Sequence, residues 1–468
     1  MSLLRLIACA LLCYCSAIWA ADEYEFLSSV PQRPSIMFNR WQENWSVLAN
    51  PKVLRKPFDE LKYIPLSKTN PKTYLSLGIN LRERFESNDA VNFSVGNSVP
   101  QSYVISRFET HADLRIANQL QAFVQLQNDN APWKTIITPV DQDRLDLEQG
   151  FVALVEPINN GTFKFRVGRQ QYAFDLQRFV SVRDGPNVRL SYDAIWGDYE
   201  HGPWRYISFY SRPVVVQNLR AFDDYSSSHY TFSGFRIERK VKVLGKVNSY
   251  VAHFKQDNVK YVSVSGNERR NILDARIVGL GAAFDWDLEL MGQEGSIANK
   301  KIRAWALGSR SGYTIKKLAW QPRIGMQIDA ASGNHHKNNN TLGTFNPLFP
   351  NGYYVTLSGY TGYSNFIHLK SALTVKPRPS LTAMIAAAAL WRETTTDAIY
   401  TQPLIPVPGT AGEGSKYTGN YYQIRFDWLM SYNFTSALEF VHFQVAEAIA
   451  AVGGRNSDYV GVEIKFGW

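Results

Sequence analysis

The chain has 468 residues, of which 45% are hydrophobic and 13% aromatic, and its formal net charge is +9. A length of this kind usually corresponds to roughly two or three soluble domains, but no linker, repeat or low-complexity stretch divides the body of the chain, so we predict one large domain. No segment approaches the run of about 18 apolar residues that a transmembrane helix needs. Cys9, Cys13 and Cys15 are the only cysteines, which excludes disulfides and cysteine metal sites from the rest of the chain.

Residues 1–20 have the pattern of a secretory signal peptide. Arg5 supplies a positive charge, an apolar run extends from Leu6 to Cys15, and small residues lead to Ala20. We expect cleavage after Ala20. Ile18, at the third position before this bond, is a less usual residue there than alanine, so the cleavage site could shift by one residue.

Residues 21–73 form an N-terminal segment that precedes the first predicted strand. Arg40–Trp45 could form one helical turn, but prolines exclude a longer helix; they are Pro31, Pro34, Pro51, Pro57 and Pro65. Two interpretations stay open for this segment. It is either a periplasmic arm or a plug that folds back into the body of the protein.

From Tyr74 onward, segments with alternating apolar and polar residues recur, as expected of strands with one apolar face. The clearest are Tyr74–Phe85, Tyr103–Ile116 and Gln119–Gln127. Further strands are predicted to begin near Leu145, Thr162, Arg189, Trp204, Tyr230, Lys246, Ile272, Trp286, Lys301, Pro322, Phe366, Leu381, Asn420, Thr435 and Ser457. The total is about eighteen, an even number typical of single-chain bacterial barrels.

The final segment, Asp458–Trp468, shows the clearest separation of two faces. One face carries Val460, Val462, Ile464, Phe466 and Trp468. A membrane barrel has no free edge, and its lipid-facing positions must be apolar. We therefore expect this strand to pair with Tyr74–Phe85 and close the cylinder. Glu463 and Lys465 would then face the lumen, opposite Arg82 and Arg84.

The connections between these segments alternate in length. Long connections at 87–102, 128–144 and 170–188 are separated by short ones near Asn118 and at 156–161. The long segments 332–365 and 392–419 again alternate with short ones late in the chain. Up-and-down barrels have short periplasmic turns and longer extracellular loops. The predicted fold is therefore all-β: a single transmembrane antiparallel up-and-down barrel over residues 74–468, with long extracellular loops and short periplasmic turns.

Basic residues outnumber acidic residues at the positions that strand alternation assigns to the lumen. The basic set comprises Arg82, Arg84, Arg107, Arg115, Lys164, Arg166, Arg323, Lys370 and Arg425. The acidic set comprises Glu109, Asp113, Glu148, Asp329, Asp427 and Glu463. A positive excess in a narrow pore attracts anions. The alternative is that these charges form structural salt bridges between neighbouring strands.

Several segments resemble the alginate export family of outer-membrane barrels. They are Phe165–Phe174 with its continuation through Arg178–Arg189 to Asp193, then Leu61–Leu66, Tyr74–Gly78, Arg82–Arg84 and Gly343–Pro350. The resemblance extends from about Arg40 to Trp468. It implies a barrel of about 18 strands with an electropositive channel for a polyanionic uronate polysaccharide. The loop 332–340 departs from the family, because it lacks the acidic residues that members often have there.

The resemblance also adds Arg169, Arg178, Arg183 and Arg189 to the basic path of the predicted channel. Guanidinium groups bind carboxylates bidentately, and a spaced series of such groups would pass a polyanion from one site to the next.

No catalytic motif, cofactor site or metal site is predicted. His335-His336 lies in an asparagine-rich loop without further ligands, and Gly308–Gly312 carries Arg310 where a nucleophilic serine would be required. The expected partners are outer-membrane lipid and lipopolysaccharide, the latter near Arg269-Arg270 in a predicted extracellular loop. A periplasmic partner could contact the basic cluster 236–246. No nucleic-acid partner is expected.

We therefore expect an integral protein of the bacterial outer membrane that is not an enzyme. The leading hypothesis is a passive channel for an anionic oligo- or polysaccharide such as an alginate-like uronate polymer. The alternative with the same fold is a porin specific for small anions such as organic or aromatic carboxylates. An outer-membrane enzyme and a non-conducting adhesin remain as hypotheses from other classes.

Overall fold

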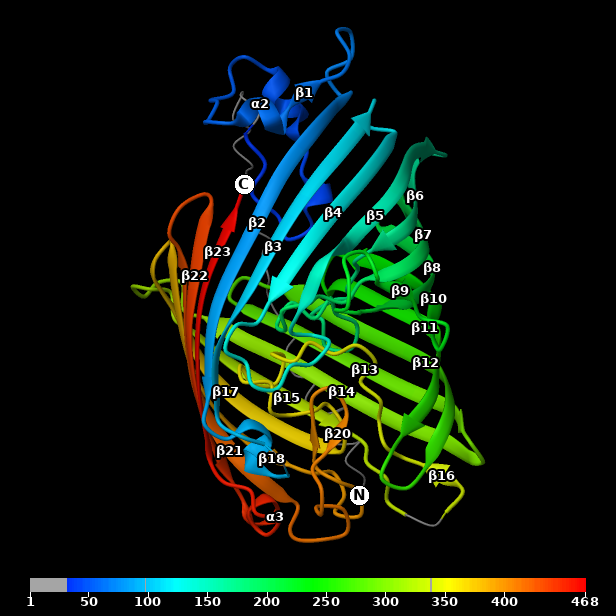
Figure 1. Ribbon diagram of the computed structural model, residues 1–468, viewed down its shortest axis with the longest axis vertical. Coiled ribbons are helices and arrows are strands. Elements are labelled where there is room, and N and C mark those ends of the chain that lie inside the picture. The colour runs from blue at the N-terminus through cyan, green and yellow to red at the C-terminus, as the bar shows by residue number, and fades with distance from the viewer. Residues whose placement is uncertain (1–31, 97, 337–338) are drawn as a thin grey trace.

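The computed structural model describes residues 32–96, 98–336 and 339–468, so the predicted signal peptide lies outside the described residues. One closed antiparallel sheet dominates the structure (Figure 1). Its long strands are β2 (Tyr74–Asn88), β3 (Gln101–Ile116), β4 (Leu120–Asn130), β5 (Asp143–Ile158), β6 (Gly161–Gln170), β7 (Tyr192–His201), β8 (Trp204–Val215), β10 (Tyr230–Val241), β11 (Gly245–Lys260), β12 (Ser265–Leu280), β13 (Phe284–Ile297), β14 (Lys300–Thr314), β15 (Arg323–Ala331), β17 (Phe366–Arg378), β18 (Leu381–Trp391), β21 (Tyr417–Leu429), β22 (Phe434–Val445) and β23 (Ser457–Gly467). The predicted up-and-down barrel of 18 strands is confirmed.

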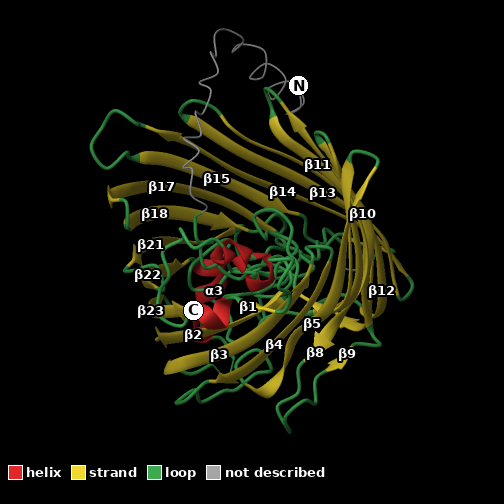
Figure 2. Ribbon diagram, turned by 90° about the horizontal axis from the view of Figure 1, so that it is seen from above, coloured by secondary structure: helices red, strands yellow, loops and turns green. Residues whose placement is uncertain are grey.

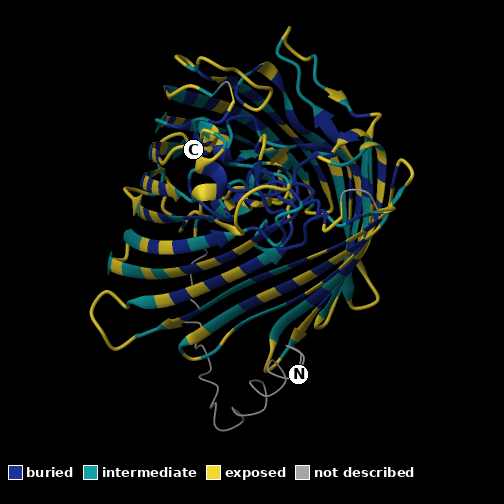
Figure 3. Cartoon of the chain, turned by 90° about the horizontal axis from the view of Figure 1, so that it is seen from below, coloured by how far each residue is buried: buried dark blue, intermediate teal, exposed yellow. Residues whose placement is uncertain are grey.

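The two faces of the barrel alternate along each strand, and bands of buried and exposed residues follow the strands in Figure 3. In β12, Arg269, Asn271 and Leu273 are exposed, whereas Arg270 and Ile272 are buried. Successive residues of a strand point to opposite faces of a sheet. The exposed set therefore forms the outer wall, and the buried set points into the barrel.

The last strand closes the barrel as its sequence predicts. β23 pairs with β2, with Lys465 opposite Arg82 and Glu463 opposite Arg84. Trp468 departs from the expected lipid-facing position. Its indole lies 4.2 Å from the Lys62 ammonium and packs edge-to-face with Phe58, so it contacts the N-terminal segment.

The predicted alternation of loop lengths holds at the start and the end of the barrel and fails in the middle. At the lower end in Figure 1, where the predicted extracellular loops lie, the connections 261–264 and 298–299 are short. At the opposite end, the turn 315–322 is longer than its neighbours. The extracellular connections contain short elements: η3 (Val91–Ser94), β9 (Tyr225–Ser226), β16 (Thr341–Leu342), β19 (Tyr400–Thr401), β20 (Ile405–Pro406) and α3 (Glu447–Ala450).

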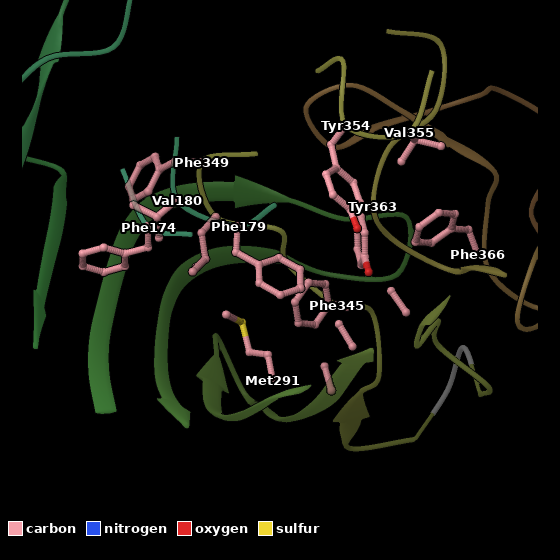
Figure 4. Packing of buried hydrophobic residues seen from close by; sticks show 14 of the residues in the cluster. Phe174, Phe179, Val180, Met291, Phe345, Phe349, Tyr354, Val355, Tyr363 and Phe366 are labelled. Carbon is pink, nitrogen blue, oxygen red and sulfur yellow. The ribbon is translucent and has the colours of Figure 1, made fainter. Parts of the chain in front are cut away.

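Two extracellular loops fold into the barrel and form its hydrophobic core (Figures 2 and 4). Residues 171–191 and 339–365 join there through a backbone bridge between Val180 and Phe349. The Phe349 amide donates to the Phe179 carbonyl at 2.9 Å. Phe179 also packs edge-to-face on Tyr363, with ring centroids 5.2 Å apart. Aromatic packing of this kind adds to the apolar area that is removed from water, so these loops fill part of the lumen.

The N-terminal segment lies at the end of the barrel where most turns are short (Figure 1). It contains η1 (Arg40–Gln42), η2 (Trp45–Ala49), α2 (Asp59–Lys62) and β1 (Ile64–Pro65), and β1 pairs with β2. Trp41 reaches the inner wall, where its ring packs edge-to-face on Phe151 at 5.8 Å. Its carbonyl accepts a hydrogen bond of 2.9 Å from Gln121. No helix in the described ranges is long and apolar enough to cross a membrane.

Docking of this N-terminal segment should strengthen as the pH rises. Burial, helped by the nearby Arg40, lowers the pKa of Lys62 from 10.5 to about 7. The docked segment therefore holds fewer protons than the free segment between these values, so docking gains up to about tenfold per pH unit in that range. We expect the anisotropy of a dye on Lys52→Cys to rise from about pH 7 to about pH 9.

The variant Lys62→Met is the control for this titration. It keeps the aliphatic contacts of Lys62 but cannot lose a proton, so its anisotropy should be independent of pH in the same range. An unchanged pH response in Lys62→Met would show that another group controls docking.

Candidate functional site

Loop residues 184–187 are fastened to β2 and β3 by two arginines of the inner wall. Arg82 donates to the carbonyls of Gly185 at 3.0 Å and Pro186 at 3.1 Å. Arg107 donates to the carbonyls of Pro186 and Asn187, both at 2.7 Å. A Cβ added at Gly185 would lie 2.6 Å from the Tyr353 ring, so the close approach of the two loops requires glycine here. The two arginines thus hold a loop inside the lumen.

Asp184 is the centre of a charge cluster in this region. Its carboxylate lies 2.7 Å from Arg107, 2.8 Å from Arg189 and 3.2 Å from Lys465. Burial alone would raise the pKa of Asp184, but Lys465, Arg189 and Arg107 lower it well below its usual value. The carboxylate therefore stays ionised and binds the loop to β3 and β23.

Arg84 is also surrounded by acceptors. It forms ion pairs with Glu86, Glu439 and Glu463, and it donates to the Tyr459 hydroxyl. The Arg84 side chain is only 2% exposed. A buried guanidinium needs such partners because the cost of removing it from water is large.

Arg178 lies in the loop 171–191 and is fully buried against the opposite wall. It pairs with Glu289 and with Asp287 at 3.4 Å, and it donates to the Tyr354 hydroxyl at 2.7 Å. A Cβ added at Gly308 would lie 2.1 Å from this guanidinium, so the glycine provides the space for it. Arg178 therefore anchors the loop and has no surface left for a ligand.

Most of the remaining predicted lumen residues are also paired with carboxylates. Arg189 contacts Glu109 at 2.6 Å as well as Asp184. The other pairs are Arg115 with Asp113, Lys164 with Glu200, and Arg425 with Asp427 and Glu439. Many of the individual residues thus form structural salt bridges, as the alternative interpretation of the lumen charges predicted.

Arg166 and Arg183 form no ion pair with any carboxylate of the described residues. The Arg166 guanidinium lies 4.4 Å from the centre of the Trp41 ring and 5.8 Å from that of Trp196, and its Nε donates to Gln170. The Arg183 guanidinium lies 5.9 Å from Phe349, and burial lowers its pKa. These two guanidinium groups have the capacity to bind an added anion.

Arg169 does not share the face of Lys164 and Arg166. It pairs in register with Asp193, two residues before the exposed Ile195, whereas its neighbour Gly168 pairs with the buried Ala194. The structure places Arg169 on the outer face near the end of β6. It forms an ion pair with Asp193 at 3.1 Å there.

Three carboxylates next to Arg169 could hold a cation. Asp143, Asp146 and Asp224 each place one oxygen within 4.8 Å of the others. Burial and the nearby Asp146 raise the pKa of Asp224 to about 6. Clustered oxygens of this kind suit Ca²⁺ or Mg²⁺. The sequence did not indicate this cluster, because Asp224 comes from a loop that is distant along the chain.

Of the basic cluster 236–246, Arg236 lies inside the barrel. It forms an ion pair with Asp175 at 2.7 Å. Lys240 and Lys242 are exposed at or next to the turn 242–244, where contact with a periplasmic partner stays a prediction.

Cavities remain in the lumen around the inserted loops. The first, of about 340 Å³, lies beside Phe38 of the N-terminal segment. Its charged lining comprises four basic residues and one acidic residue: Arg82, Arg107, Arg189, Lys465 and Glu109.

The second cavity, of about 680 Å³, lies on the other side of the same segment. Its charged residues are Arg115, Lys164, Arg166, Arg205 and Asp198. Four aromatic residues share this lining, namely Trp41, Phe165, Tyr172 and Trp196.

The third cavity, of about 260 Å³, contains Arg310, Arg323 and Lys370, and its described lining has no carboxylate. Arg205 and Arg310 were not among the predicted site residues. Each shares the inner face of its strand with apolar residues that pack on the inserted loops. Arg205 precedes Ile207 and Phe209 in β8, and Arg310 follows Ala304 and Ala306 in β14. Alternation alone cannot distinguish such a face from one that contacts lipid.

Comparisons with known proteins agree with this architecture. The sequence model of the alginate export family matches residues 73–463. Among solved structures, Pseudomonas aeruginosa OccK5 (OpdH) has a TM-score of 0.54 at 11% identity, covering 84% of this chain and 97% of that one. Pseudomonas aeruginosa OccK2 (OpdF) in complex with glucuronate has a TM-score of 0.53 at 11% identity, covering 84% and 96%.

At these identities the solved structures show the fold alone. No curated protein matches the sequence. The family match covers most of the chain, from the start of β2 into the last strand, β23. The chain belongs to the alginate export family and is an integral β-barrel protein of the bacterial outer membrane.

Proposed function

We propose that the protein is a channel for anionic saccharides, with uronate oligomers or polymers as its cargo, and that it leaves the cargo chemically unchanged. The observation that carries this proposal is the charge of the lumen cavities. Basic residues outnumber acidic residues in the lining of each of the three cavities described above. In a narrow space with walls of low dielectric constant, such an excess raises the local concentration of anions.

The second cavity has the chemistry that a uronate needs. Arg166 supplies a guanidinium without a carboxylate partner, and guanidinium groups bind carboxylates in a bidentate manner. Trp41 and Trp196 supply flat apolar surfaces next to it. A sugar ring can pack on such a surface while its carboxylate binds Arg166. Charge and aromatic surface therefore occur together in one cavity.

The distribution of the cavities suits transport better than tight binding. They lie around the inserted loops, and none exceeds about 680 Å³. Conduction requires several sites of modest affinity, so that a substrate can leave each site as well as enter it. The OccK2 structure, which has the same fold, is a complex with glucuronate, a uronate monomer, and this supports a uronate as the cargo proposed here.

A porin for small anions is the second candidate, and the filled lumen favours it. Residues 171–191 and 339–365 occupy the space between the cavities. A polymer requires a continuous path, so these loops would have to move before it could pass. A monomeric organic or aromatic carboxylate would fit into a single cavity without such a movement.

In planar lipid bilayers under a salt gradient, we expect the purified protein to conduct anions in preference to cations. Oligomeric uronates should block the current. Arg166→Gln should weaken this block on the order of tenfold, because one charge-assisted hydrogen-bond partner is lost. Comparing block by glucuronate with block by its oligomers separates the two candidate functions.

Lys317→Gln is the matched control for this experiment. Lys317 is an exposed lysine in the turn 315–322, outside the three cavities. A preference for cations in the unaltered protein would refute the proposal, as would equal effects of the two substitutions. Surface binding of uronates without any conductance would favour an adhesin, and conversion of the cargo would favour an enzyme.

A second prediction concerns Asp184, whose ion pairs hold one side of the loop 171–191 to the barrel wall. Asp184→Asn removes the carboxylate that pairs with Arg107, Arg189 and Lys465, leaving these cations less compensated. We expect loop opening to become more favourable by about 1–3 kcal/mol. Single-channel recordings should then show higher conductance, more frequent transitions and stronger anion preference.

Asp458→Asn serves as the control for this measurement, because its side chain is 67% exposed and pairs only with His442. Unchanged conductance and unchanged selectivity in Asp184→Asn would show that the Asp184 cluster does not restrain the loop.

A further inference from the structure

A groove of about 960 Å³ crosses the outer wall of the barrel over β10 to β14. β10 to β14 pair without register shifts in this part of the wall, so their outward-pointing residues form rows across it. The lowest of three rows is apolar and consists of Phe235, Val251, Leu273, Gly292 and Trp305. A Cβ added at Gly292 would meet nothing within 4 Å, so this glycine lies at an open point of the groove.

The next row toward the extracellular end is polar. It consists of Ser233, His253, Asn271, Glu294 and Arg303. His253 and Asn271 interact across the two strands at 3.0 Å. This change from apolar to polar residues marks the boundary between the hydrocarbon region and the head groups of the outer leaflet.

The third row carries a concentration of positive charge. Lys255, Arg269 and Lys301 lie in it, on β11, β12 and β14. Lys255 contacts Asp257 at 3.5 Å. Arg269, Lys301 and the neighbouring Arg303 form no salt bridge with any residue in the described part of the chain. Neighbouring strands are about 4.8 Å apart, so these three cations lie within reach of one head group.

The connections that join β11 to β12 and β13 to β14 at the extracellular end are too short to cover the basic row. The connections 261–264 and 298–299 have only four and two residues, unlike the long loops elsewhere at this end. β16, from a longer loop, pairs along the edge of β14 beside Lys301, and Lys301 is still exposed there. The strands β11 and β12 each have 16 residues and extend the wall beyond the apolar row. The short loops thus leave an apolar groove open, with an exposed cationic row immediately above it.

We propose that this groove is a specific binding site for lipopolysaccharide. An acyl chain occupies the groove beside Gly292, between Leu273 and Trp305, and phosphates of the sugar head group bind Arg269, Lys301 and Arg303. Burial of the acyl chain stabilises the complex in proportion to the apolar area that is covered. The guanidinium forks of the two arginines match phosphate oxygens. The site faces away from the lumen, so the proposal does not depend on the cargo of the channel.

The position of the basic row favours lipopolysaccharide over other lipids. The cations lie at the extracellular end of the strands, where the outer leaflet presents its phosphorylated sugars. A zwitterionic phospholipid would give these three unpaired cations one phosphate together with an ammonium group of its own. Charge complementarity therefore favours a lipid with several phosphates and no cationic group.

The test is native mass spectrometry of the full-length mature protein in detergent, titrated with diphosphorylated lipid A. We expect stoichiometric binding. The triple variant Arg269→Gln, Lys301→Gln, Arg303→Gln should lower the affinity at least tenfold. The matched control, Lys242→Gln, Lys316→Gln, Lys317→Gln, removes three exposed lysines from the opposite end and should bind like the unaltered protein.

Gly292→Leu tests the groove separately, because it fills the open point and retains every charge. It should also lower the affinity several-fold, and its added side chain faces lipid, so folding should be unaffected. Equal affinity in the basic variant and in its control would overturn the proposal. Equal binding of phosphatidylglycerol and lipid A would also overturn it, since that result indicates attraction to any anionic lipid.

Discussion

The closure of the sheet is the constraint on which the rest of the structure depends. In the hydrocarbon region, backbone amides and carbonyls have no water to bind, so an unpaired strand edge is prohibitively costly. The pairing of β23 with β2 removes the last edge. Once the sheet is closed, alternate residues of every strand have different surroundings, lipid outside and the lumen inside. Both the lipid-facing groove and the charged lumen follow from this division.

Inside the lumen, the same closure forces charges to lie close together. Arginine side chains from neighbouring strands cannot leave the barrel, and a buried guanidinium is unstable without partners. Carboxylates such as Glu463 and Asp184 therefore neutralise many of them individually. The positive excess persists in the cavity linings because Arg166, Arg310 and Lys370 have no such partner among the described residues. Structural salt bridges and the basic excess of the cavity linings are thus two consequences of one arrangement.

The sequence predicted the barrel well because strand alternation is a local signal that needs no distant partner. The other strands of the barrel begin close to their predicted positions, but β12 begins at Ser265 and not near Ile272. The prediction that Arg269-Arg270 lies in an extracellular loop was therefore wrong, because both residues belong to this strand. The interior was less predictable. The contacts of Arg178 with Glu289 and of Arg82 with Gly185 join residues more than a hundred positions apart. Neither composition nor periodicity encodes such pairs.

The two sides of the loop 171–191 differ in the interactions that hold them in the lumen. One side is held to the lumen by aromatic packing around Phe179, which an anion cannot displace. The other side is held by Asp184 and by backbone carbonyls that accept from Arg82 and Arg107. The carboxylate of the proposed cargo would present to Arg107 the same group as Asp184 does, so we expect it to compete with the loop for this arginine. We therefore expect an anion in the first cavity to weaken the polar contacts of the loop, with the aromatic packing as its remaining attachment.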